Sequence, residues 1–73
     1  MALPESQREK LLGELRTLQT RERRLVQSLQ LALRVRDQEE INRLSSELAD
    51  LLLRADVLRE ALGLPPDEWG SAP

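Results

Sequence analysis

The side chains in this sequence that are able to bind or transform another molecule are arginines and carboxylates, because there is no Cys and no His. Disulfides and thiolate metal sites are therefore excluded, and the most common protein ligand of transition metals is missing. No glycine-rich phosphate loop, Ser–His pair or Asx-rich calcium loop accompanies the carboxylates. We therefore expect no enzymatic activity, no cofactor and no small-molecule substrate.

The densest basic group is RERR at positions 21–24, with Arg16 nearby. Arginines in such a group are able to bind the phosphates of a nucleic acid or of an anionic membrane surface. However, Glu14 and Glu22 interrupt the group, the net charge of the chain is −2, and no aromatic residues lie among the arginines. We interpret the group as a solvated helix face and keep nucleic-acid or membrane binding as the least favoured alternative.

The overall composition is typical of long helices that pack through leucine. Charged residues make up 33% of the 73 residues and aromatic residues 1%, and good helix formers dominate the rest. A chain this short is usually stabilised by disulfides, a metal or association, and association is the one that remains. No apolar run approaches the ~18 residues that a membrane span requires, and no targeting segment is visible. We expect a soluble, intracellular protein.

Apolar residues repeat with steps of three and four along two segments, with one gap at Glu22 in the first, which predicts helices at 6–35 and 38–62. An N-terminal tail at 1–5 and a flexible, Pro-rich tail at 63–73 would flank them. The predicted seam residues are Leu11, Leu15, Leu18, Leu25, Leu29, Ala32, Ile41, Leu44, Leu48, Leu51, Ala55, Leu58 and Leu62.

Capping signals mark the predicted helix ends. Ser6, with Glu9 three residues later, predicts the first N-terminus, and Asp37 with Glu40 predicts the second. Gly63, followed by Leu-Pro-Pro, predicts the end of the second helix.

Three observations favour a turn near 36–37 and an antiparallel coiled-coil hairpin. The two seams are out of phase across RVRDQEEI at 34–41, so one straight helix would need a phase slip there. Folding the chain back between Arg36 and Asp37 brings seam residue against seam residue at every level but one, where Glu22 meets Leu51. Residues 1–36 hold eight Lys or Arg and four Asp or Glu, whereas the rest hold three and nine. Because the turn contains no Gly or Pro, a single long helix with a stutter remains open.

Apolar residues outside the seam predict a second contact surface, which self-association or a helical partner would cover to complete a bundle. The predicted partner-binding residues are Ala49, Leu52, Leu53, Val57, Leu31, Val35, Glu22 and Trp69. Glu22 would set register with a partner arginine or turn outward beside Arg43 or Arg54. Trp69 would anchor a docking motif or fold back onto the hairpin. The sequence thus predicts a small interaction subunit or adaptor, with a homodimeric helical spacer as the alternative.

Overall fold

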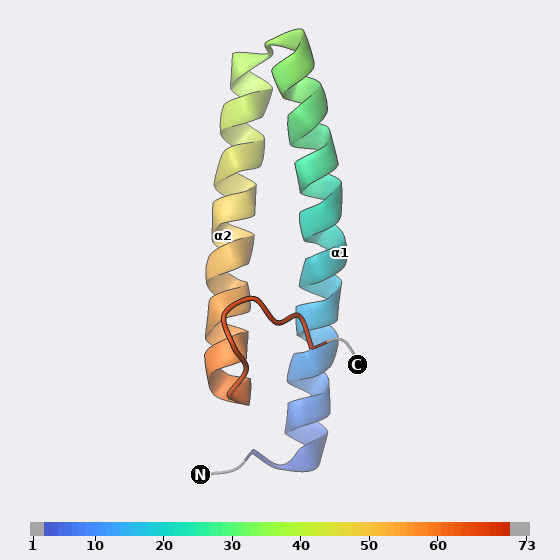
Figure 1. The fold of residues 1–73 in the computed structure, drawn as a ribbon, viewed down its shortest axis with the longest axis vertical. Helices are drawn as coiled ribbons and strands as arrows, with labels where there is room; N and C mark the ends of the chain where they lie inside the picture. Colours follow the sequence, from blue (N-terminus) through green and yellow to red (C-terminus); the bar gives the residue numbers. More distant parts are fainter. Residues whose placement is uncertain (1–2, 71–73) are drawn as a thin grey trace.

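The chain folds into two antiparallel helices that lie side by side (Figure 1). In the computed structural model, which describes residues 3–70, α1 spans Glu5–Val35 and α2 spans Gln38–Leu62. The predicted all-α hairpin is therefore confirmed, and a single long helix is excluded. Because α1 has 31 residues and α2 has 25, the first turns of α1 extend beyond the end of α2 (Figure 1). Completion into a larger bundle stays a prediction.

The start of α1 differs from the prediction. Pro4, rather than Ser6, occupies the N-cap position, and no side chain caps the helix there. The predicted Ser6 cap is therefore wrong, because Ser6 already lies inside the first turn. The carbonyl of Pro4 accepts the backbone N–H of Arg8 at 2.9 Å. Proline disfavours the helical conformation in the residue before it, so the helix extends back to Pro4 and no further.

The turn between the helices depends on one arginine in the left-handed conformation. Arg36 has φ 56° and ψ 39°, and its N–H donates to the carbonyl of Leu33 at 3.3 Å, while the N–H of Asp37 donates to that of Ala32 at 3.1 Å. This pattern closes α1 in the manner usually associated with glycine. The Asp37 side chain then accepts the Glu40 N–H at 3.2 Å, which confirms the predicted cap of α2.

Gly63 ends α2 as predicted. It has φ 70°, and its N–H donates to the carbonyl of Glu60 at 3.2 Å. The N–H of Leu64 donates to the carbonyl of Arg59 at 2.8 Å. These two bonds satisfy carbonyls of the last turn, and they direct the following residues away from the helix axis.

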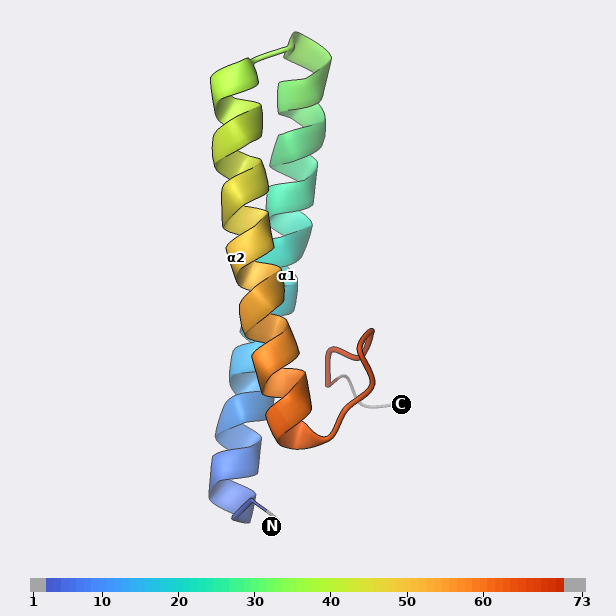
Figure 2. The same cartoon turned by 90° about the vertical axis from the view of Figure 1, so that its left-hand side faces the viewer.

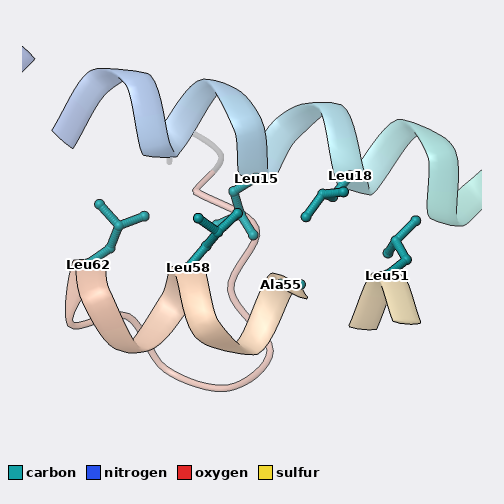
Figure 3. Close-up of a cluster of buried hydrophobic side chains, with 6 residues drawn as sticks. All are labelled: Leu15, Leu18, Leu51, Ala55, Leu58 and Leu62. Carbon is teal, nitrogen blue, oxygen red and sulfur yellow. The ribbon is translucent and has the colours of Figure 1, made fainter. Parts of the chain in front are cut away.

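The core lies along the predicted seam. The buried apolar residues among 3–70 are Leu15, Leu18, Ala32, Leu44, Leu51, Ala55, Leu58 and Leu62, and all of them are seam residues. The remaining seam residues, Leu11, Leu25, Leu29, Ile41 and Leu48, are half-buried. Leu15 and Leu58 pack deepest, at 0% and 1% exposed, and they point toward one another from the two helices (Figure 3). The main cluster lies near the open end of the hairpin, so the turn end has the thinner core.

Candidate functional site

The apolar surface that α1 leaves uncovered on α2 is a row of side chains, here called the α2 stripe. The stripe consists of Ala49, Leu52, Leu53 and Val57. Leu53 lies two positions from both Leu51 and Ala55, so at about 100° per residue it is about 160° around the helix from each of these seam residues. Leu53 is 65% exposed, Val57 is 55% exposed and Leu52 is 40% exposed. Ala49, Leu53 and Val57 therefore face away from α1, whereas Leu52, one position from Leu51, flanks the seam.

Acidic side chains border the α2 stripe. Asp50, Asp56 and Glu60 are exposed, and their spacing from Leu53 puts them on the same half of the helix surface. Neither Asp50 nor Glu60 forms an ion pair with any of the residues that the structure describes. Asp56 pairs with Arg59 at 2.9 Å, yet its side chain stays 66% exposed. Negatively charged side chains thus border the stripe.

The other two arginines of α2 are turned to neighbouring carboxylates. Arg43 pairs with Glu40 and, at 3.0 Å, with Glu47. Arg54 reaches across to α1, where its Nε lies 2.6 Å and its Nη2 3.1 Å from the two carboxylate oxygens of Glu14. Neither arginine therefore neutralises the border of the stripe.

The Glu14–Arg54 pair runs opposite to the average charge of the two helices. Residues 1–36 are net basic and the rest net acidic, whereas this cross-helix pair has its acid on α1. The hydrogen bond from Arg54 is the main cause that lowers the pKa of Glu14 below its ordinary value. Both side chains are about half exposed, so the pair orients the helices more than it stabilises them.

A second apolar area lies beside the turn. Leu31 and Val35, which are 62% and 72% exposed, line a shallow groove of about 250 Å³ together with Leu44 and Glu40. Leu33 is also exposed, at 55%, and is not among the predicted partner-binding residues. This area is on the thin end of the core and is separate from the α2 stripe.

Glu22 interrupts the apolar seam of α1. It is half-buried, and within residues 3–70 it forms no ion pair. Arg43 and Arg54, its predicted neighbours, bind the other carboxylates already described. A role in partner register stays a prediction.

The basic group of α1 is divided in the structure. Arg21, Arg23 and Arg24 are exposed, whereas Arg16 donates to the carbonyl of Gly70 from Nε at 3.3 Å and from Nη2 at 3.1 Å. One of the four arginines therefore also holds the tail, while its side chain stays exposed.

The tail folds back over the open end of the hairpin. Residues 64–70 cross from α2 toward α1 and lie on one side of the two helices (Figures 1 and 2). Trp69 packs against the core cluster, with the guanidinium carbon of Arg59 4.5 Å from its ring centroid. Arg59 also donates from Nε to the carbonyl of Glu68 at 2.6 Å. The structure thus shows the folded-back alternative for Trp69; residues 71–73 of the predicted flexible tail lie outside the described residues, as do 1–2 of the N-terminal tail.

The described residues hold no group of three or more acidic side chains arranged to bind a metal ion. Neither α1 nor α2 contains a stretch with the length and hydropathy needed to cross a bilayer. Comparison with protein-family models, with curated proteins and with solved structures finds no match.

Proposed function

We propose that this chain is a non-enzymatic protein–protein interaction module, which acts as a small helical subunit or adaptor in a larger intracellular complex. The observation that carries the proposal is the α2 stripe, an apolar row on the side of α2 opposite the seam. Residues 64–70 fold back on the open end of the hairpin and on the core cluster. Leu53 and Val57 stay exposed with the tail in this position, and we therefore assign the partner to the stripe.

Burial of the stripe would supply part of the free energy of association. Burial of apolar surface contributes ~25 cal/mol per Å², so a few hundred Å² contribute several kcal/mol before the costs of association are subtracted. The hairpin presents the row on a rigid helix, and few side chains need to be ordered on binding. Both features favour a helix packed in parallel or antiparallel along α2.

The test compares two leucine-to-glutamate variants in cells that naturally make the protein. Leu53→Glu places a carboxylate in the centre of the stripe. Leu33→Glu makes the same change at a similarly exposed leucine on the other helix, and so controls for helix propensity and added charge. Circular dichroism establishes that both variants are helical, and quantitative mass spectrometry measures which proteins co-purify with each.

We expect Leu53→Glu to lose partners that the wild type and Leu33→Glu both retain. If the same proteins co-purify with all three forms, the α2 stripe is not the contact surface and the proposal is wrong. The alternative, a homodimeric spacer, predicts instead that Leu53→Glu converts a pure dimer into a monomer without loss of any other protein.

A further inference from the structure

We propose that the occupant of the α2 stripe is an amphipathic helix of another protein, whose apolar row is bordered by Lys and Arg. The inference rests on the proposed function and specifies the partner of the same surface. It follows from the acidic side chains around the stripe and from the poor fit of either helix of a second copy to the stripe.

The charges at the stripe are of one sign. Asp50, Asp56 and Glu60 border it, while the arginines of α2 are turned to carboxylates or covered by the tail. A helix that packs on Leu53 and Val57 brings its own flanking side chains beside this acidic border. Lys and Arg in those positions gain attraction, whereas Asp and Glu meet like charge, which costs free energy and slows association.

A second copy of the chain fits the stripe poorly in the symmetric arrangement. Two copies that pair antiparallel through their α2 helices, centred on Leu53, are related by a two-fold axis. Asp50 and Asp56 lie on opposite sides of Leu53, so the two Asp50 side chains share one flank of the interface and the two Asp56 side chains share the other. Ala49 then meets Val57, which makes a narrow apolar contact between two acidic borders. Like charges gathered along each flank oppose such a dimer.

The α1 helix of a second copy does not offer an apolar surface that would cover the stripe either. Its basic outer face carries Thr17, Thr20 and Arg24, which are all exposed, and the apolar side chains Leu31 and Val35 lie only beside the turn. Such a head-to-tail contact would also not be closed between two copies, and it would continue into a ring or an open chain of copies. The charges thus match a basic helix, and within residues 3–70 neither α1 nor α2 combines a basic face with an apolar outer row along its length.

The test is selection from a displayed library of helical peptides of about three heptads, with Leu or Ile along one row and either Lys or Glu at each flanking position. The full-length chain is the bait, and Leu53→Glu is the counter-bait. A second bait carries Asp50→Lys and Glu60→Lys, which reverse the border without touching the Asp56–Arg59 pair. Sedimentation equilibrium of each bait alone reports self-association.

We expect the wild type to enrich Lys-flanked over Glu-flanked peptides by at least about tenfold, which corresponds to ~1.4 kcal/mol. The preference should weaken as salt rises, disappear with Leu53→Glu and shift toward Glu-flanked peptides with the reversed bait. Val57→Glu, also at an exposed position, repeats the loss if Leu53→Glu proves poorly folded.

Three results would overturn the inference, and they distinguish it from the proposed function. Enrichment that depends on Leu53 but shows no preference for Lys refutes the basic partner and leaves helix docking in place. A wild-type dimer that Leu53→Glu dissociates makes a second copy the occupant. If the wild type enriches no peptide relative to Leu53→Glu, both the inference and the proposed function fail.

Discussion

Replacing Arg36 by glycine tests the turn on which the antiparallel arrangement depends. Arg36 adopts φ 56° and ψ 39°, a left-handed conformation that strains any residue with a Cβ atom by ~1–2 kcal/mol. Glycine adopts it without that strain. Arg36→Gly therefore relieves a cost that is already present in the folded hairpin.

The expected gain is the difference between two opposing effects. Relief of strain contributes ~1–2 kcal/mol, while the greater freedom of glycine in the unfolded chain takes back ~0.4–1 kcal/mol. The free energy of unfolding should thus rise by roughly 0.5–1 kcal/mol. For a domain of this size, that raises the Tm by about 2–8 °C.

The assay is thermal and urea unfolding followed by circular dichroism, at several protein concentrations because association would shift the Tm. Arg36→Ala removes the guanidinium but keeps the strain, so it should leave stability nearly unchanged. Arg34→Gly, two residues before Arg36 and inside α1, should destabilise by ~1 kcal/mol. If Arg36→Gly destabilises as much as Arg34→Gly does, Arg36 is helical in solution and the hairpin is refuted.

Three further substitutions test the cap, the tail and the cross-helix pair. Asp37→Ala removes the side-chain acceptor for the Glu40 N–H and should lower the free energy of unfolding by ~1 kcal/mol in urea titrations; no change would mean that α2 does not begin there. Trp69→Ala should cost about 1–2 kcal/mol, less than for a fully buried tryptophan, whereas a mobile tail predicts no loss. The lowered pKa of Glu14 means that its contribution is present above the ordinary carboxyl pKa of 4.5 and is lost as the pH falls through the lower folded value. Glu14→Gln should lack this part of the acid-induced loss, and identical pH profiles would show that the pair does not form.

The fold was largely predictable because the sequence signals for it agree with one another. Steps of three and four, broken only at Glu22, predict one face per helix, and burial of Leu15 and Leu58 follows from that face. Asp37 and Gly63 are residues whose own chemistry closes helix ends. Local signals of this kind do not depend on where the rest of the chain lies.

The features that were not predictable depend on three-dimensional context. A left-handed Arg36 has no signature in the sequence, because arginine gains nothing from that conformation and accepts it only where both helices pack. The Ser6 signal failed because Pro4 had already set the backbone for a helix two residues upstream. The Glu14–Arg54 pair opposes the average charge of the two helices. Whether two side chains pair depends on their positions along and around the two helices, and the net charge of each helix does not contain that information.

The geometry of the two helices makes them unequal as docking surfaces. The outer face of α1 is polar along the middle of the helix, whereas α2 is apolar both toward α1, at Leu51 and Ala55, and away from it, at Leu53. A partner bound on the α2 stripe would make α2 the central helix of a larger bundle, with Leu53 and Val57 taken out of water. Because a ligand that binds only the folded state stabilises that state, the partner would stabilise a hairpin whose own core is thin beside the turn. Folding and recognition would therefore depend on the same helix, so a change at the stripe should affect both properties only when the partner is present.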